Sequence, residues 1–498
     1  MTAVSPAVEA APAAAPRTPY PVRPLTVVLL ATFMNQFGVT AVSVAIPSIQ
    51  RDLGSSYAAV QWVFAGYLLP LALLLVSGGR LGDVIGRRRS FLLGTAGFTL
   101  ASGLAGLAGS VELLIAARVL QGIAAAVMAP QVLAVYRVLV PAKRRGPVLA
   151  AYASVVSLAT ISGPLLGGLL VQADIAGLGW RSIFLINVPL GALAVLGGYL
   201  YLPESGGGAR RRLDLSQAVL AAVALLLLIY PLMHGRENGW PWWAWASLAA
   251  SLPALALFLG YQRHRERRFG SEAALIPLHL FRETAFTIGL VANFIVAALI
   301  TGFFFVFVVF LQNGLGLSPA HIGVTMAPWA LGTALGSIAA IPLSRKLGRG
   351  TLLAGSTLMA AGMGALLLGV VLAGARLTSG QAFAGLFVFG VGVAMVSAPI
   401  LNVTLGAIPH VDAGSASGVF NTFRQTGSAF GVALTGALYF GRLGEQSAGS
   451  SGDHVASIKL TILLALAACL LVLALVVRLP RAATEIRDHE EEPARPVL

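Results

Sequence analysis

A single acid among four arginines is the sharpest chemical pattern in this sequence. It occurs in the stretch from Gly79 to Arg89, where Asp83 lies between Arg80 and the basic run that begins at Arg87. A carboxylate there can accept hydrogen bonds from free N–H groups at a helix N-terminus. The simpler interpretation is a basic cytoplasmic loop with one incidental acid. The candidate gating residues of this stretch are Gly79, Asp83, Gly86 and Arg87.

Part of this stretch is repeated later in the chain. Two sets of residues share one spacing: Leu81, Gly86 and Arg87, and then Leu343, Gly348 and Arg349. Arg345 takes the place of the acid in the second set. A repeated loop indicates a duplicated unit, and duplicated helical bundles are typical of alternating-access transporters.

Polar side chains inside long apolar runs form a second group of candidates. Arg118 is the charged one, and a charge inside a membrane costs about 2.5–3.5 kcal/mol on insertion scales. It should therefore face a cavity or a partner, or be bonded to helix carbonyls as a structural residue. The amides that could share its cavity are Asn35, Gln36, Gln121, Gln131, Asn293 and Asn402. Each amide alone is as well explained by a hydrogen bond between helices.

A third pattern lies between Ser154 and Leu170. Pro164 should bend a helix, because its ring crowds the preceding turn and it cannot donate to Thr160. Small residues on both sides of it let a second helix approach closely. The candidates here are Gly163, Pro164, Gly167 and Gly168. The stretch is interpreted either as a kinked packing helix or as a pivot between two moving bundles.

The composition shows which elements must position these residues. Hydrophobic residues make up 57% of the 498 residues and charged residues only 10%, too few charges for a soluble fold of this length. The single cysteine, Cys469, excludes a disulfide framework. The chain has no zinc-ligand spacing, Walker loop or nucleophile elbow, so we expect no enzyme activity, no cofactor and no metal. The net charge of +14 comes from short arginine clusters between apolar runs, which favours membrane orientation over nucleic-acid binding.

The apolar runs predict an all-α membrane protein with fourteen transmembrane spans. The predicted spans are 24–46, 59–78, 90–109, 112–135, 147–171, 183–202, 215–234, 242–261, 284–311, 320–343, 351–374, 381–402, 415–440 and 457–479. Arginines gather in alternate loops, which predicts that both termini are cytoplasmic.

The order of these motifs resembles the major facilitator superfamily. Gly79 to Arg89 looks like its signature between spans 2 and 3, and Leu114 to Gly122 looks like its span-4 motif. Gly163 to Gly168 is similar to the span-5 motif of its exporters. Further stretches narrow the resemblance to the fourteen-span drug:proton antiporters: Gln61-Trp62-Val63 with Tyr67; Trp180 to Gly191; and Ser417-Gly418 with Asn421, Arg424, Gln425 and Gly427.

The resemblance implies two six-helix bundles with an inserted helix pair. The expected parts are a disordered tail at 1–23, an N-terminal bundle at 24–203, spans 7 and 8 with their linkers at 204–282, a C-terminal bundle at 283–480 and a tail at 481–498. It also implies that spans 1, 4, 9 and 12 line a central cavity, and that spans 2, 5, 10 and 13 form the contacts that open and close.

One departure from the family pattern affects coupling. The acid that the first span of these antiporters usually carries is replaced here by Gly38. Only Glu112, at the outer end of span 4, could dip into the membrane as another proton carrier, and only if it is buried. The substrate itself could also carry the acid.

The sequence therefore predicts a secondary active transporter of the bacterial inner membrane. We expect a monomer in the lipid bilayer that exports small hydrophobic organic compounds, such as antibiotics, with protons as the coupling ion and no nucleic-acid partner. Two alternatives remain at this stage: an importer or facilitator of a specific solute, and a membrane sensor that transports nothing.

Overall fold

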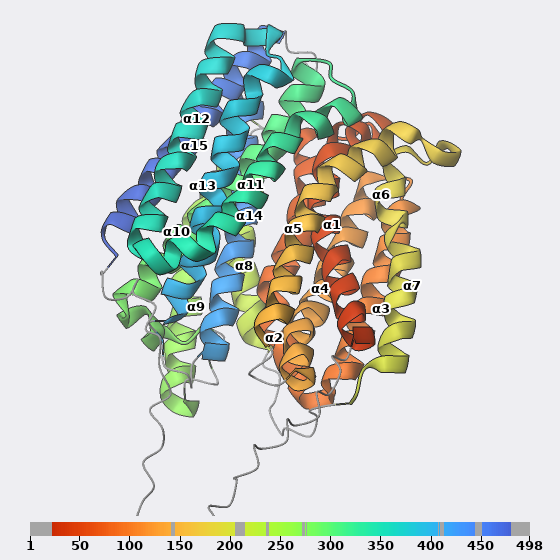
Figure 1. Ribbon diagram of the computed structural model, residues 1–498, viewed down its shortest axis with the longest axis vertical. Helices are drawn as coiled ribbons and strands as arrows, with labels where there is room; N and C mark the ends of the chain where they lie inside the picture. Colours follow the sequence, from red (N-terminus) through yellow and green to blue (C-terminus); the bar gives the residue numbers. More distant parts are fainter. Residues whose placement is uncertain are drawn as a thin grey trace, which may run out of the picture.

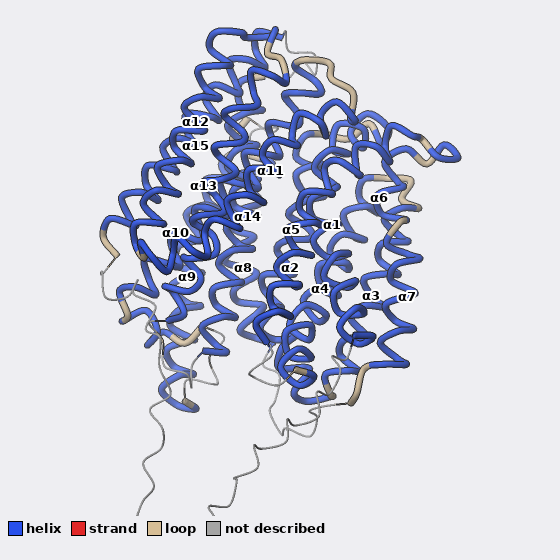
Figure 2. The backbone as a smooth tube through the Cα atoms, viewed as in Figure 1, coloured by secondary structure: helices blue, strands red, loops and turns tan. Residues whose placement is uncertain are grey.

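The part of the chain that the computed structural model describes consists of helices joined by short loops, with no strand there (Figure 2). Those residues are 22–140, 145–204, 215–235, 239–270, 274, 276–406, 408, 413–443 and 451–479. The predicted tails lie outside them, apart from residues 22 and 23. The predicted all-α fold is therefore confirmed.

The helices form two bundles that stand side by side (Figure 1). The first contains α1 (Val22–Leu53), α2 (Tyr57–Ile85), α3 (Arg87–Gly106), α4 (Val111–Leu139), α5 (Arg145–Ala173), α6 (Ser182–Leu185) and α7 (Asn187–Tyr201). The second contains α10 (Thr284–Val309), α11 (Pro319–Leu347), α12 (Arg349–Ala373), α13 (Ser379–Gly406), α14 (Ala413–Arg442) and α15 (Ser451–Val477). A π-helical turn at Phe310–Gly314 extends α10.

Between them in the sequence, α8 (Leu215–His234) and α9 (Trp242–Phe269) form a hairpin. The hairpin lies at the lower centre of Figure 1, where α8 packs on α2 of the first bundle and on α14 of the second. Helix α8 therefore joins the two bundles from outside their shared face.

Eleven described helices are long and apolar enough to cross a membrane. The long helices α3, α5 and α14 do not meet that measure, although they coincide with the predicted spans 90–109, 147–171 and 415–440. Of these, α5 and α14 pack against the opposite bundle. Helices on the bundle interface need less apolar surface than helices that face lipid.

The two bundles repeat one packing scheme. In the first, α1 pairs with α5, α2 with α4 and α3 with α7; in the second, α10 pairs with α14, α11 with α13 and α12 with α15. The chain turns in the same way as well, because α2 meets α3 at Gly86 and α11 meets α12 at Gly348 without an intervening loop. Their φ angles are 101° and 49°. The spacing that the two loops share in the sequence therefore reflects the same joint in each bundle.

Glycines bring the paired helices into backbone contact. A Cβ atom on Gly302 of α10 would lie 2.5 Å from the carbonyl oxygen of Gly431 on α14. A Cβ on Gly336 of α11 would lie 2.7 Å from the carbonyl oxygen of Val391 on α13. Neither position has room for a larger residue unless the helices separate, so close van der Waals packing at the backbone holds these helix pairs of the second bundle together.

Replacing Gly86 with alanine should destabilise the joint between α2 and α3. Left-handed backbone costs an L-residue with a Cβ about 1–2 kcal/mol. Gly86→Ala should therefore lower the thermal unfolding midpoint of the protein purified in detergent. Gly260→Ala is the matched control, because a Cβ at Gly260 on α9 meets open space. Equal midpoints for the two variants would contradict this account of the joint.

Candidate functional site

Arg118 lies at the centre of the first bundle and is completely buried. Its Nε donates to the carbonyl oxygen of Val63 on α2 at 2.9 Å, and one terminal nitrogen donates to the carbonyl oxygen of Gly38 on α1 at 3.3 Å. The same nitrogen donates to Oε1 of Gln121 at 2.6 Å. The other terminal nitrogen has no hydrogen-bond partner among the described residues.

Aromatic and amide side chains complete this cluster. The Arg118 guanidinium carbon lies 4.4 Å from the ring centroid of Tyr67, whose hydroxyl donates to Oδ1 of Asn35 at 2.8 Å. The side-chain nitrogen of Gln121 donates in turn to the hydroxyl of Ser102 on α3 at 2.7 Å. The cluster thus ties α1, α2, α3 and α4 together. Of the two interpretations of Arg118, the structure supports the one in which helix carbonyls bind it, and it leaves the guanidinium no exposed surface.

The remaining polar candidates do not converge on Arg118. Gln131 donates to the carbonyl oxygen of Gly78 on α2 at 2.8 Å, and Asn293 donates to that of Phe420 on α14 at 3.0 Å. Gln36 on α1 is half-buried, and Asn402 on α13 is exposed. The idea of one cavity shared by all these amides is therefore wrong for Gln131 and Asn293, which join helices.

Glu112 is not buried, which was the condition for it to act as a proton carrier. It lies in the first turn of α4, beside the helix cap formed by Ser110, and its side chain is exposed. An exposed carboxylate has no burial to hold its proton near neutral pH.

The first cross-bundle contact joins the last turns of α5 to the first turn of α11. Gln172 Oε1 accepts a hydrogen bond from the backbone nitrogen of Ala320 at 3.2 Å. A Cβ on Gly168 would lie 2.5 Å from the carbonyl oxygen of Pro319, and one on Gly323 would lie 3.2 Å from the carbonyl oxygen of Pro164. A cavity of about 160 Å³ opens next to this contact, between Pro164 and the α11 residues that follow Gly323.

The three candidate glycines of α5 therefore face two different helices. Gly168 packs on the opposite bundle, as expected. The expectation is wrong for Gly163 and Gly167, which lie against Thr40 and Ala41 of α1 in their own bundle. Pro164 lies inside α5, which runs through it as one helix.

The second cross-bundle contact joins α2 to α14. Thr422 Oγ1 donates to the carbonyl oxygen of Ala72 at 3.2 Å. Closer to the start of α2, a Cβ on Gly436 would lie 2.6 Å from the side-chain amide of Gln61. Beside this contact, Trp62 of α2 donates to Nδ1 of His234 on α8 at 3.3 Å.

The acid of the repeated loop lies near the end of α2. Gly79 and Asp83 are in its last two turns, Gly86 is the joint, and Arg87 begins α3. The Asp83 side chain is not among the described ones, nor is that of Ser415 at the start of α14. The hypothesis that Asp83 meets this helix start therefore stays a prediction.

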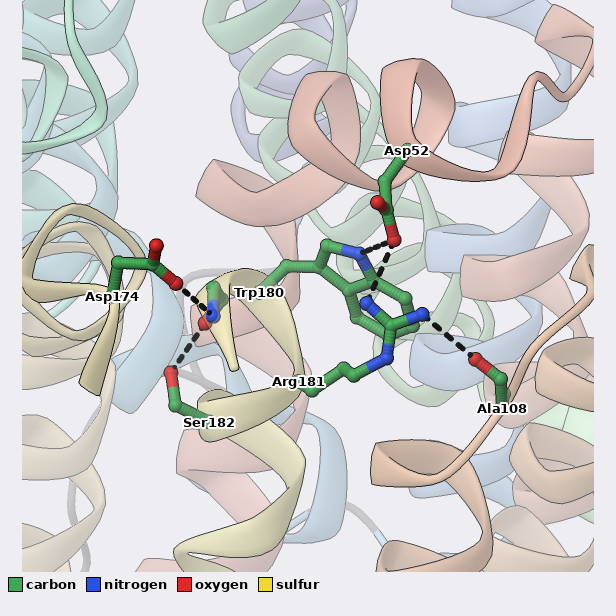
Figure 3. A network of polar contacts seen from close by, with 7 residues as sticks. Asp52, Ala108, Asp174, Trp180, Arg181 and Ser182 are labelled. Carbon is green, nitrogen blue, oxygen red and sulfur yellow. Dashed lines mark hydrogen bonds and ion pairs between the residues drawn. The ribbon is translucent and has the colours of Figure 1, made fainter. Parts of the chain in front are cut away.

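A polar network that sequence reasoning missed joins three segments at the far end of the first bundle (Figure 3). Asp52, at the end of α1, accepts from Trp180 Nε1 at 2.9 Å and from Arg181 at 2.7 Å on the same oxygen. Arg181 also donates to the carbonyl oxygen of Ala108, between α3 and α4, at 3.2 Å. The signal was present, since Trp180 and Arg181 begin one of the family-like stretches, but their partner lies far away in the sequence.

The turn that carries Arg181 is itself fixed by short hydrogen bonds. Asp174 accepts from the backbone nitrogen of Gly179 at 2.8 Å, and Ser182 donates to the carbonyl oxygen of Gly179 at 2.6 Å (Figure 3). The turn follows directly on Gln172 of α5. The cross-bundle contact at Gln172 is therefore attached to a stiff end of its bundle.

Comparison with known proteins identifies the family to which this chain belongs. The family model described as Major Facilitator Superfamily matches residues 28–432. The chain belongs to this superfamily. It is thus a multi-pass membrane transporter of small molecules and not an enzyme.

Several curated relatives are named as transporters or export proteins. The probable actinorhodin transporter of Streptomyces coelicolor is 38% identical over 430 residues, covering 86% of this chain and 74% of that protein. The tetracenomycin C resistance and export protein of Streptomyces glaucescens is 34% identical, covering 84% and 76%. The cephamycin export protein of Amycolatopsis lactamdurans is 36% identical, covering 82% and 83%.

Solved structures of the same fold include a POT family transporter in complex with 5-aminolevulinic acid. Its TM-score is 0.66 at 13% identity, covering 92% of this chain and 96% of that one. A bacterial homologue of the human lysosomal transporter Spinster, in an inward-facing and occupied conformation, has a TM-score of 0.62 at 16% identity, covering 92% and 97%. At these identities the likeness shows the fold alone.

A lysine at position 118 should weaken the first bundle. One ammonium group cannot reach carbonyls on α1 and α2 together with Gln121, so Arg118→Lys should lose about 2–3 kcal/mol of folding stability. Thermal unfolding in detergent measures this, with Arg376→Lys, at an exposed site between α12 and α13, as the control. A variant as stable as the control would show that the bonds to the carbonyls contribute nothing.

A leucine at position 168 should separate α5 from α11. Gly168→Leu should reduce transport and open the cavity beside the contact, because the side chain cannot fit against Pro319. Met326 of α11 lines that cavity and is 2% exposed. Thiol labelling in a Met326→Cys background therefore reports the opening, since the native Cys469 is buried.

The matched control for this gate is Gly364→Leu, on an open face of α12. It should change neither transport nor the labelling of the cysteine introduced on α11. If Gly168→Leu transports normally and that cysteine stays protected, the contact between α5 and α11 is not a gate.

Proposed function

We propose that this chain is a secondary active exporter of small, hydrophobic organic molecules in a bacterial inner membrane. The observation that carries the proposal is the agreement among relatives more than 30% identical along most of their length, which are named as a probable actinorhodin transporter, a tetracenomycin C resistance and export protein and a cephamycin export protein. That agreement supports the export of such compounds by this chain.

The proposed topology has fourteen spans and two cytoplasmic termini. Eleven spans rest on length and apolar composition, and α3, α5 and α14 would complete the set. The proposed units are the N-terminal bundle at 24–203, the inserted pair at 204–282 and the C-terminal bundle at 283–480. The alternation of arginine clusters sets the orientation.

The proposed mechanism is alternating access. With a cytoplasmic N-terminus, the contact between the end of α5 and the start of α11 lies at the outer surface, as does the packing of Gly436 on Gln61. The structure then represents a state that is closed toward the outside. Opening outward would break these contacts, and Gly79, Asp83, Gly86 and Arg87 would form the gate on the inner side.

Protons are the proposed coupling ion, since the sequence has no ATPase motif. Gly38 stands where an acid is usual in the resembled antiporters, and Glu112 is exposed. No other described carboxylate inside the two bundles is buried. A weakly acidic substrate that carries its own proton is the simplest way to couple export to the gradient in such a protein.

Export can be tested with a drug-susceptibility panel in a bacterial host that lacks its own pumps. Production of the protein should raise the inhibitory concentration of hydrophobic antibiotics, and a proton uncoupler should abolish the protection. Asp83→Asn, produced at the same level, should protect less, because the amide lacks the negative charge that interacts favourably with the positive end of a helix dipole.

Two results would count against the proposal. Protection that persists with the uncoupler would exclude proton coupling. A protein that reaches the membrane and alters the accumulation of no compound in the panel would exclude export.

A further inference from the structure

His454 is a buried titratable side chain that the proposed function does not yet use. It lies in the first turn of α15 and is 4% exposed. Its Nδ1 and the hydroxyl of Tyr439, on α14, share a hydrogen bond of 2.8 Å. The π-helical turn after α10 closes the site, because a Cβ on Gly314 would lie 3.0 Å from the Cβ of His454. The imidazole is therefore enclosed by segments of the second bundle.

A proton on this ring would change the bond to Tyr439. Histidine is the side chain whose ordinary pKa lies closest to neutral pH. A neutral imidazole can accept the phenol proton at Nδ1, whereas an imidazolium donates from both ring nitrogens and cannot accept it. Protonation also places a charge among buried side chains. A proton on His454 therefore favours any state of the protein that lets water reach the ring.

The surroundings of His454 hold no buried carboxylate in the described part of the chain. The segments that pack on α15 are α10 with its π-helical turn, α12, α14 and the turn Gly374–Arg376. The titratable or charged side chains of α15 and these segments are Arg349, Arg376, Arg424, Tyr439, Arg442, Asp453, Lys459 and Cys469. Asp453 is the acid of this set, and it is exposed, so water screens its charge. A charge on His454 has no buried counter-charge among these residues.

A chain of buried aromatic rings connects His454 to the opposite bundle. The ring centroids of His454 and Tyr439 are 6.0 Å apart, and those of Tyr439 and Phe440 are 5.2 Å apart. Phe440 meets Phe305 of α10 at 6.2 Å, and Phe305 meets Phe64 of α2 at 5.7 Å. The side chains of the tyrosine and the three phenylalanines are at most 3% exposed. The rings thus run from α15 through α14 and α10 to the first bundle.

This chain of rings ends inside the contact between α2 and α14. Gln61 lies one turn before Phe64 on the same face of α2, and it packs against Gly436, three residues before Tyr439. Oε1 of Gln61 is buried without a hydrogen-bond partner among the described residues, and so is the hydroxyl of Ser457, one turn after His454. Unpaired buried polar atoms are unfavourable, so hydration of these two atoms would favour separation of the helices.

We propose that His454 is a proton-binding site of the transporter and that a proton from the outer medium releases the contact between α2 and α14. The proton ends the bond that Tyr439 donates, the outer turn of α14 shifts, and Phe305 loses its packing on Phe64. The assignment rests on the proposed export function and topology, in which α15 begins at the outer surface. It names a proton-carrying side chain where Gly38 and Glu112 supply none.

Acid on the outer side should favour the outward-open state. A hydrated imidazole has a pKa of about 6.5, whereas an imidazole that stays neutral in the closed state takes up no proton there. Lowering the pH from 7.5 to 5.5 should then raise the ratio of open to closed protein about tenfold. The gradient would thereby open the side on which the substrate is released.

Distances between two spin labels can measure this opening. The labels are attached at Ile175→Cys, in the turn after α5, and at Ala375→Cys, in the turn after α12, because both side chains are exposed and the native Cys469 is buried. Double electron–electron resonance on the full-length protein in lipid nanodiscs should show the tenfold shift toward the longer distance. His454→Gln should lose this shift, because the glutamine amide does not titrate.

Two further variants separate the proton site from a structural role. His321→Gln is the matched control, since His321 is an exposed histidine in the first turn of α11, and this variant should keep the full response to pH. Tyr439→Phe keeps the imidazole and removes its partner hydroxyl. It should raise the ratio of open to closed protein about fivefold at pH 7.5, the effect of losing one hydrogen bond, and should still respond to acid.

The failure of this site can be distinguished from the failure of export. The site is wrong if folded His454→Gln responds to pH as the unaltered protein does, or if the unaltered protein does not respond. If His454→Gln does not fold, an unchanged ratio in Tyr439→Phe overturns the site in its place. These distances are measured without substrate, so export in the susceptibility panel would stand in each case. If the distances respond as expected and the protein protects against no compound, the site stands and the proposed function fails.

Discussion

Close backbone contact between helices is the constraint on which the structure depends. Lipid chains are as apolar as leucine, so hydrophobic burial does little to drive helices together in a bilayer. Helices associate only where their surfaces fit, and the glycines at Gly302, Gly336 and Gly431 bring backbones together without side chains between them. The same device appears within each bundle and, at Gly168 and Gly323, between the bundles. The contacts within a bundle and those between the bundles are thus made of the same chemistry and differ in extent.

Polar groups fix the relative positions of the helices more specifically than contacts between small residues can. Arg118 fixes the relative positions of α1, α2 and α4 by donating hydrogen bonds to backbone carbonyl oxygens of α1 and α2. These oxygens can keep their hydrogen bonds within the helix, because a carbonyl oxygen can accept two hydrogen bonds. At the far end of the bundle, Asp52, Trp180 and Arg181 do the same for α1 and two connecting turns. The first bundle is therefore held at its centre and at one end. A unit of this kind can move as a rigid body.

Hydropathy and motif order were sufficient to predict the helical membrane fold and the superfamily, because both signals depend on residues that are close together in the sequence. These signals were not sufficient to predict which neighbouring helix a single residue contacts. Gly163, Gly167 and Gly168 lie within two turns of one helix, and only the tertiary structure shows that the first two face α1 and the third faces α11. Arg118 and Arg424 both lie inside predicted spans, yet the sequence analysis singled out only Arg118 as a charge inside the membrane. Their difference lies in partners far away in the sequence: Arg118 has the carbonyl oxygens of Val63 and Gly38, and Arg424 has no such bond among the described residues.

The placement of α8 has a mechanical consequence. This helix rests on α2 of one bundle and on α14 of the other, and an apolar cavity of about 510 Å³ separates part of it from α2 and α4. If the bundles rotate relative to each other, as in the proposed cycle, α8 must slide over at least one of the two helices on which it packs. The cavity gives that sliding some room, while the bond from Trp62 to His234 resists it. In the proposed alternating-access cycle the inserted hairpin would therefore resist the exchange between states, and the sequence of α8 would set the speed of that exchange without touching the substrate.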